Sequence, residues 1–550
     1  MPDPLPVNLS RDDFAALVEA NAAPGRTLAI PVAARLLSDQ LTPVLAYRRL
    51  VAADQRIAPS FLLESVEGGE RQGRYSILGA QPITEVVAFA NEVDIRHADG
   101  AAASLGVADS DRRPAVSPFA VIRGLTARLR LVHPPSRGSR DELPACVLGG
   151  WFGFAGYDTV RYDEPGKLSF ATAPPDDRFL PDLHFALYDG VVVFDHVDKV
   201  VFLVQLALVP HGTDARAVYD LALARLEGRL ALIERHSKPL PSGLLDHDAQ
   251  GGHALASNMT RAEHAAMVAR ALEYIRAGDV FQVVLGQRFE RKSPADPFDV
   301  YRALRAVNPS PYMVYLQARG CILIASSPEI LCRVRASADE RHPGGARLTL
   351  TNRPLAGTRR RGATPAEDAA LERELLADAK ERAEHIMLVD LGRNDVGRVA
   401  RPGSIRLPGV MEIERYSHVM HISSTVTGEL REGLDCWDAL RATLPVGTIS
   451  GAPKIRAMQV IDELEPLRRG PYGGGVGYVG LDGQMDIALT LRTIVAPTAL
   501  RDASGWTYHL QASGGIVADS VAADEYAETV NKSAALARAV DVAESAFGPR

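Results

Sequence analysis

The chain has 550 residues, of which 46% are hydrophobic and 23% are charged, a composition typical of a folded protein with roughly two to four domains. A net charge of −7 gives no basic surface field for a nucleic acid, so we expect any anionic substrate to be a small acid held by a few local cations. Four cysteines without disulfide or metal spacing, and the lack of a bilayer-length apolar stretch, favour a cytoplasmic protein that binds no membrane.

The N-terminal half is rich in predicted strands. Residues 191–194 and 200–208 are apolar, β-branched runs separated by a short polar segment, which predicts a hairpin of buried strands. Residues 237–259 are rich in turn formers and lack apolar periodicity, which is typical of a linker. We therefore predict an N-terminal region over residues 1–236 and a C-terminal region over residues 260–550.

Three helices and a strand are expected in the C-terminal region. Thr260 and Glu263 form a capping-box pattern that predicts the start of a helix, which Gly278 ends. A strand is expected over residues 280–289, with side chains on alternating faces. Apolar periodicity predicts two more helices, over about residues 365–391 and 522–547.

Each of these two later helices carries a Glu-x-x-Glu segment, with Glu381 and Glu384 in the first and Glu525 and Glu528 in the second. Residues three apart share one face of a helix, so two such faces brought together would surround one hard cation with four carboxylates. An isolated pattern of this kind is usually a solvated helix face. Other motifs must therefore favour the metal site.

Two segments look like nucleotide-binding loops but lack the required context. Residues 475–480 match Gly-x-Gly-x-x-Gly, yet a turn and a strand follow where a dinucleotide site needs a helix. Residues 447–454 lack the adjacent Gly-Lys-Ser/Thr of a phosphate-binding loop. We expect no nucleotide site at either segment.

Seven motifs, in order along the C-terminal region, resemble those of the chorismate-utilising enzymes. They include Ser326-Ser-Pro-Glu329 and His418-Val-Met-His421, and the full set spans residues 278–285, 326–329, 354–359, 380–395, 418–421, 447–454 and 525–532. Residues 62–65, 73–76 and 308–313 resemble the anthranilate synthase component I family in particular. The resemblance implies an α+β fold with large, mostly antiparallel sheets flanked by helices and a strand-rich N-terminal region.

The resemblance also implies roles for individual residues in a site that binds chorismate and Mg²⁺. Glu384 and Glu528 correspond to the nearest metal carboxylates, and Glu381 and Glu525 to carboxylates behind water. Glu329 resembles the general acid that protonates the leaving hydroxyl, and His421 the histidine linked to pyruvate elimination. The other positions that match the catalytic or substrate-binding pattern are Gln282, Thr448, Thr358, Tyr472, Arg492, Gly514, Gly515 and Lys532.

Two positions favour amination at the carbon next to the ring carboxylate. Relatives that add water carry a lysine at Gln282, whereas ammonia is already a nucleophile and needs no base. The related aminodeoxychorismate synthase subunits carry a lysine at Ala356. The resemblance therefore implies conversion of chorismate and ammonia to anthranilate and pyruvate, the first committed step of tryptophan synthesis. An aminodeoxychorismate synthase subunit and a catalytically silent chain that binds chorismate or tryptophan remain alternatives.

The resemblance implies a partner chain and an inhibitor. Since no glutaminase motif is present, we expect ammonia to come from glutamine through a separate glutamine amidotransferase in a hetero-oligomer; Cys146 and Cys321 are interpreted as buried core residues. We also expect feedback inhibition by tryptophan. The matching positions are Leu63, Glu64, Ser65, Pro311, Tyr312, Met313, Val476 and Tyr478.

Overall fold

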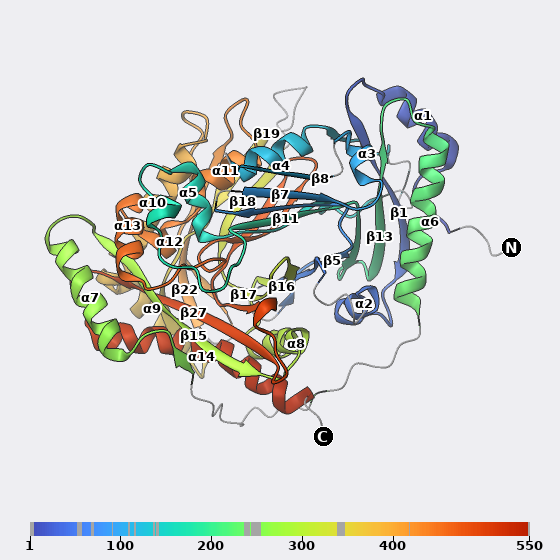
Figure 1. Cartoon of the computed structure of the whole chain (residues 1–550). Coiled ribbons are helices and arrows are strands. Elements are labelled where there is room, and N and C mark those ends of the chain that lie inside the picture. The colour runs from blue at the N-terminus through green and yellow to red at the C-terminus, as the bar shows by residue number, and fades with distance from the viewer. Residues whose placement is uncertain are drawn as a thin grey trace.

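Two large β-sheets stack face to face, and helices cover their outer faces (Figure 1). The computed structural model describes residues 5–51, 58–67, 71–90, 92–107, 110–114, 117–135, 138, 142–235, 243, 255–337, 347–416 and 419–547. None of the helices within these ranges is long and apolar enough to cross a membrane.

The first sheet contains 13 strands among the described residues, all antiparallel to their neighbours except β9, which runs parallel to β1. In spatial order they are β14 (Ala256–Ser257), β15 (Gln282–Ser293), β27 (Trp506–Ile516), β26 (Thr493–Pro497), β17 (Cys321–Ser327), β16 (Tyr312–Ala318), β2 (Ser60–Glu64), β5 (Tyr75–Ala80), β12 (Gly190–Asp195), β13 (Val200–Val209), β1 (Thr27–Leu37) and β9 (Leu129–Leu131), with β23 (Gly451–Ala452) beside β15.

The second sheet contains 12 antiparallel strands within the described ranges. Their order is β20 (Leu355–Arg360), β22 (Val419–Glu429), β19 (Arg347–Asn352), β18 (Ile330–Ser337), β25 (Met485–Leu489), β24 (Gly475–Gly480), β10 (Gly150–Ala155), β11 (Leu183–Tyr188), β6 (Thr84–Phe89), β7 (Glu92–His97) and β8 (Ser110–Pro114), with β21 (Arg406–Arg415) beside β22. A small separate ladder joins β3 (Val66–Glu67) to β4 (Arg71–Gln72).

An apolar core fills the space between the two sheets. Phe61 of the first sheet and Phe152 of the second stack with ring centroids 3.9 Å apart, and Tyr188 packs edge-on against both. Both rings of the stacked pair are fully buried. Interdigitated aromatic and branched side chains of this kind hold two sheets at a fixed distance.

Helices pack on the outer face of each sheet and bury a second and a third core. On the first sheet lie α1 (Arg11–Asn21), α2 (Pro43–Leu50), α6 (Ala215–Glu234), α8 (Pro297–Val307) and α14 (Ala522–Phe547); on the second lie α4 (Pro118–Thr126), α10 (Ala379–Gly397) and α11 (Cys436–Thr443). The remaining helices are α3 (Ala101–Leu105), α5 (Val160–Asp163), α7 (Arg261–Arg276), α9 (Pro365–Ala377), α12 (Gly447–Ser450) and α13 (Lys454–Leu464).

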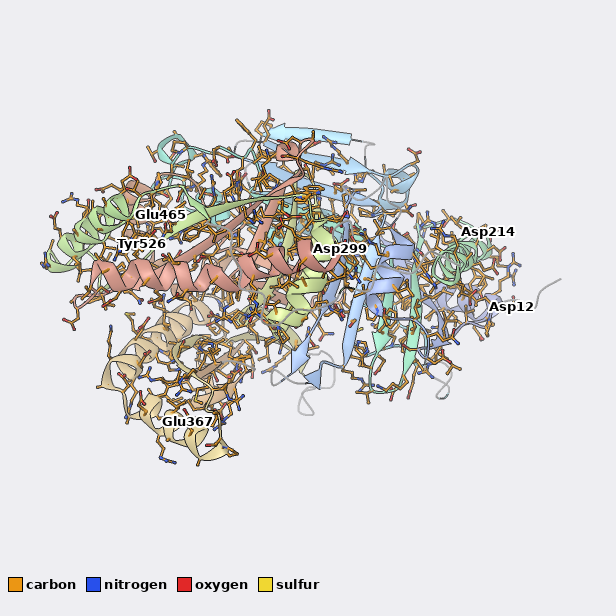
Figure 2. The ribbon with its side chains drawn as sticks, turned by 90° about the horizontal axis from the view of Figure 1, so that it is seen from below. Asp12, Asp214, Asp299, Glu367, Glu465 and Tyr526 are labelled. Carbon is orange, nitrogen blue, oxygen red and sulfur yellow. The ribbon has the colours of Figure 1, made fainter. Side chains whose placement is uncertain are left out.

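Different helices lie at the two ends of the molecule. The helices α1 and α6 lie at one end beside β1 and β13, and α7, α9 and α10 lie at the other (Figure 1). From below, Tyr526 of α14 lies beside α7, and Glu367 of α9 belongs to a group of elements that projects from the body (Figure 2). The two predicted Glu-x-x-Glu segments lie in the first two turns of α14 and of α10, the helix that follows α9.

Most of the predicted elements are confirmed. The predicted hairpin is β12 and β13, the capping box of Thr260 opens α7, and α14 spans the predicted residues 522–547. The single helix expected over residues 365–391 is wrong, because α9 ends at Ala377 and α10 begins at Ala379. Asp378 between them accepts hydrogen bonds from the backbone NH groups of Lys380 and Glu381, and this local capping competes with a continuous helix.

Both sheets contain strands from both predicted regions. β2 pairs with β16 in the first sheet, and β10 pairs with β24 in the second. The two regions therefore share their core. Most of the expected linker at 237–259 lies outside the described residues, and the division itself stays a prediction.

Candidate functional site

The two glutamate-bearing helices meet at a pair of glycines on β27. A Cβ atom added at Gly515 would lie 2.5 Å from Gln282 Nε2 and 3.6 Å from Glu384 Oε1. One added at Gly514 would lie 2.8 Å from Glu525 Oε2. Any side chain on these glycines would therefore occupy the space where the carboxylates of α10 and α14 approach each other.

Two of the four predicted metal carboxylates are paired with cations. Arg359 Nη1 lies 3.2 Å from Glu381 Oε1, and Lys532 Nζ lies 2.6 Å from Glu528 Oε1. Lys532 also donates a hydrogen bond of 3.0 Å to the carbonyl oxygen of Ser513, next to the glycine pair. These cations partly neutralise one glutamate on each helix.

The other two carboxylates, Glu384 and Glu525, form no direct ion pair within the described residues, although Lys532 lies near both. Burial raises the pKa of Glu384, and the nearby negative charges of Glu381 and Glu528 raise it further, although a 3.0 Å hydrogen bond from Gln282 opposes this. Burial and the charge of Glu528 likewise raise the pKa of Glu525. Repulsion between these groups would be relieved by a bound cation.

The donor atoms at this place fit Mg²⁺. Glu525 Oε2 and Gln282 Oε1 are buried without a hydrogen-bond partner, and both are hard oxygen ligands of the type that Mg²⁺ prefers. Within the described ranges, no three His, Cys, Asp or Glu side chains converge closely enough to hold a metal by themselves. The residues therefore suit an ion that takes further ligands from water or from a bound molecule.

Glu329 is held in an environment that favours its protonated form. It lies just before β18 and is buried, with Thr448 Oγ1 of α12 donating a 2.9 Å hydrogen bond to its Oε1. Burial raises the pKa of Glu329 to about 8, the negative charge of Glu414 adds to the effect, and hydrogen bonds from Thr448 and the backbone of Leu355 oppose it. The carboxyl group can therefore donate a proton at neutral pH.

His421 is neutral, and its tautomer follows from its partners. Its Nδ1 lies 3.0 Å from both the carbonyl oxygen of Gly357 and Thr358 Oγ1 on β20. Because a carbonyl oxygen only accepts, we assign the ring proton to Nδ1, which leaves the buried and unpartnered Nε2 as a proton acceptor. Burial, with the nearby cation of Arg492, lowers the pKa of His421 to about 4.

Arg492 and Tyr472 supply a cation and a hydroxyl to the same region. Arg492 has a left-handed backbone with φ of 46°, which is strained for a non-glycine residue, and burial lowers its pKa. No side chain or backbone group within the described ranges forms an ion pair or hydrogen bond with its guanidinium. Burial raises the pKa of Tyr472 to about 12, and its hydroxyl lies at Ser513 beside the glycine pair.

A cavity of about 650 Å³ contains every position predicted for the inhibitor. Its lining includes Leu63, Glu64, Ser65, Pro311, Tyr312, Met313, Val476 and Tyr478. Glu64 is buried in the wall, where Tyr301 donates a 2.7 Å hydrogen bond and Arg305 forms an ion pair at 2.7 Å. The cavity thus combines apolar walls with fixed charges, as a site for an amino acid requires.

The sequence interpretation missed several residues of these sites. Cys146, expected in the core, is only half-buried and lines the cavity, whereas Cys321 is buried as expected. Arg359, which pairs with Glu381, was not singled out. Glu414 was also missed, although it lies directly opposite His421 in the register of β21 and β22. A predicted hairpin over residues 406–429 would have indicated that position.

Glu329→Gln is expected to stabilise the folded protein at alkaline pH. The folded state keeps a proton up to about pH 8, whereas an unfolded chain releases it near the ordinary pKa of 4.5. Between these values the unfolded state binds fewer protons, so stability falls as pH rises, and glutamine escapes that loss. Near pH 8 we expect a gain on the order of a few kcal/mol, seen as a higher melting temperature, with almost no gain near pH 4. Equal melting temperatures near pH 8 would contradict a buried, uncharged Glu329.

Comparisons with known proteins agree over almost the whole chain. A model of the family described as chorismate binding enzyme matches residues 59–538. The chain is 52% identical over 536 residues to anthranilate synthase alpha subunit 1, chloroplastic, of Arabidopsis thaliana, covering 94% of this chain and 86% of that protein. It is 43% identical over 519 residues to anthranilate synthase component 1 of Pseudomonas aeruginosa, covering 94% and 96%.

A solved structure supports the same relationship. Anthranilate synthase component I from Streptococcus pneumoniae TIGR4 has a TM-score of 0.65 and 33% identity, covering 92% of this chain and 99% of that one. The α+β fold with large antiparallel sheets, expected from the motifs, is thereby confirmed. The chain belongs to the chorismate binding enzymes and, within them, to the family of anthranilate synthase component I and alpha subunits.

Proposed function

We propose that the protein is the large subunit of an anthranilate synthase, which converts chorismate and ammonia to anthranilate and pyruvate. The observation that carries the proposal is the presence of a buried acid and a buried base: Glu329, which accepts a hydrogen bond from Thr448 and has a raised pKa, and His421, whose Nε2 has no partner and whose pKa is lowered. Environments that separate an acid from a base in this way are typical of catalytic sites. The relatives named above are all anthranilate synthase chains, which favours this activity over the two alternatives.

The residues divide the reaction between them. Ammonia attacks the ring carbon next to the carboxylate while the ring hydroxyl leaves, and Glu329 donates the proton that makes it water. In the second step His421 Nε2 accepts the ring proton as the C–O bond to the enolpyruvyl group breaks, which makes the ring aromatic. The released enolpyruvate takes up a proton at its methylene carbon to become pyruvate. Arg492, whose guanidinium has no protein partner among the described residues, pairs with the enolpyruvyl carboxylate, with Tyr472 beside it.

Mg²⁺ is proposed as the resident metal, and when bound it supplies Lewis-acid polarisation of the ring carboxylate. Glu384 and Glu528 would be its nearest carboxylates, with Glu381 and Glu525 acting through water. The pairing of Glu381 with Arg359 supports an outer position for this carboxylate, because the arginine already holds it. An inner position for Glu528 requires Lys532 to turn toward the substrate carboxylate instead.

Ammonia is proposed to come from glutamine through a separate glutamine amidotransferase chain, in a hetero-oligomer. Supporting this, the sequence contains no glutaminase motif. We also propose that tryptophan inhibits the enzyme from the 650 Å³ cavity, whose lining includes all eight matching positions. A cytoplasmic site of action remains a prediction.

The purified chain is expected to form anthranilate from chorismate, ammonium and Mg²⁺, as followed by anthranilate fluorescence. Glutamine should replace ammonium only after the amidotransferase is added. Because Glu329 must be protonated, kcat/KM per free ammonia should fall as pH rises through about 8, and Glu329→Gln should lower kcat by about 10²- to 10⁴-fold. Glutamine-dependent turnover by the single chain, another aromatic product, or no product with either nitrogen source would overturn the proposal.

Replacement of the metal carboxylates should affect activity unequally. Glu384→Gln or Glu528→Gln is expected to raise the Mg²⁺ concentration for half-maximal activity by tenfold or more, about 1.4 kcal/mol in binding. The same change at Glu381 or Glu525, which act through water, should raise it less. Mg²⁺ titrations of the four variants at saturating chorismate measure this, and equal shifts in all four would refute the inner and outer positions.

Gly73→Ala is expected to weaken tryptophan inhibition. A Cβ atom at residue 73 would lie 1.7 Å from Ser65 Oγ, so Ser65 must leave its place in the cavity wall. We expect the half-inhibitory tryptophan concentration to rise by at least tenfold, or about 1.4 kcal/mol, with uninhibited kcat retained. Gly166→Ala is the matched control, since a Cβ there meets no atom within 4 Å. Unchanged inhibition in Gly73→Ala would count against a ligand at Ser65.

A further inference from the structure

The proposed inhibitor cavity and the proposed catalytic residues share one wall. Arg353, Glu414 and Tyr416 line the cavity and are called the shared wall here. The same cavity is lined by Pro328 and Ile330, which flank Glu329 in the chain. The cavity therefore extends from Ser65 to the residues on both sides of the proposed acid.

The three residues of the shared wall contact one another through polar groups, and the last of them, Tyr416, packs against His421. Arg353 Nη2 lies 2.7 Å from Glu414 Oε1, and the hydroxyl of Tyr416 donates a 2.8 Å hydrogen bond to Glu414 Oε2. The ring of Tyr416 packs against the ring of His421, with centroids 5.6 Å apart and planes at 61°. Tyr416 is only 7% exposed, so its ring has little room for another position.

Glu414 connects the wall to both proposed proton carriers. In the β21–β22 ladder it lies directly opposite His421, and residues opposite each other in an antiparallel pair project from the same face. Its negative charge contributes to the raised pKa of Glu329. Tyr416 in turn lies close enough to Arg492 for the two to interact electrostatically. Glu414 at the end of β21 and Tyr416 just beyond it thus lie near three proposed active-site residues, Glu329, His421 and Arg492.

Ion pairs and hydrogen bonds add to the packing at this end of the hairpin. β21 is mostly exposed over its first residues and partly buried at its end, where Ile413 packs against Met420 and Ile422. Its last residue, Arg415, forms ion pairs with Asp368 and Glu372 of α9, and Arg361 Nη1 donates a 2.7 Å hydrogen bond to the carbonyl oxygen of Tyr416.

We propose that Tyr416 is a positioning residue for both sites: its bond to Glu414 in the cavity wall holds the His421 ring, so a ligand filling the cavity changes catalysis through Tyr416. This inference rests on the proposed function and names the route of its regulation. The coupling is reciprocal, so tryptophan and chorismate must each weaken binding of the other by the same factor.

The experiment measures that factor. Tryptophan binding to the full chain is followed by calorimetry with and without saturating chorismate, in the absence of any nitrogen source, and the ratio of the two dissociation constants is the coupling. Tyr416→Phe keeps the ring on His421 and removes the hydroxyl that reaches Glu414. We expect its ratio to fall at least fivefold toward one, while tryptophan still binds the chorismate-free protein.

Tyr312→Phe is the matched control. Tyr312 also lines the cavity and donates a hydrogen bond, of 3.1 Å to Asp486, but no ring or hydrogen-bond contact joins it to His421 among the described residues. We expect Tyr312→Phe to weaken tryptophan binding and to keep the wild-type ratio. A wild-type ratio in Tyr416→Phe, or an equal loss in both variants, would overturn the role of Tyr416.

A second variant tests whether the charge of Glu414 affects the protonation of Glu329. The measurement is a pH profile, which a purely structural role of Glu414 would not change. Glu414→Gln keeps an acceptor for Tyr416 and removes the charge that raises the pKa of Glu329, whose other polar neighbours are Thr448 and the backbone of Leu355. The alkaline limb of kcat/KM per free ammonia should move to lower pH. An unmoved limb would overturn the connection. If the wild-type chain makes no anthranilate or binds no tryptophan, the proposed function itself fails, and this inference with it.

Discussion

The stacking of two sheets on one apolar core is the constraint on which both candidate sites depend. The sheets are held together where Phe61 stacks on Phe152, and the cavity opens where this core ends, between Leu63 of the first sheet and Val476 of the second. Because close-packed interiors transmit displacement rather than absorb it, a ligand wedged between the sheets acts on the strands of both. β18, which carries Ile330, Arg333 and Arg335 of the cavity lining, begins directly after Glu329.

Burial without a compensating charge sets the protonation states of Glu329 and His421. The same burial lowers the stability of the folded protein. Glu329 and His421 are both neutral because the folded chain removes them from water, and Arg492 keeps its charge in a strained backbone conformation. Each of these features destabilises the empty protein relative to an apolar or exposed replacement. Their presence in one small region is therefore better explained by binding and chemistry than by folding.

Local patterns predicted the elements and the identities of the site residues, but not their partners. The caps and periodicity of α7 and α14 depend on neighbours in sequence, so these helices were placed correctly. The break at Asp378 was missed because one carboxylate that caps a helix overrides a continuous apolar pattern. The contact between Glu414 and Tyr416 and their approach to His421 depend on the pairing of β21 with β22, a hairpin that the sequence interpretation did not include.

The four glutamates illustrate the same limit in electrostatic terms. Their i, i+3 spacing makes the two members of each helix pair equivalent. In the folded chain, however, Glu381 pairs with Arg359 and Glu528 pairs with Lys532, whereas Glu384 and Glu525 have no direct ion pair among the described residues. A metal ion that binds Glu384 gains attraction at a carboxylate that no cation holds, whereas one that binds Glu528 must first displace an ammonium 2.6 Å away. The two proposed inner ligands are therefore not energetically equal, and the difference is set by the ion pair of Glu528 with Lys532.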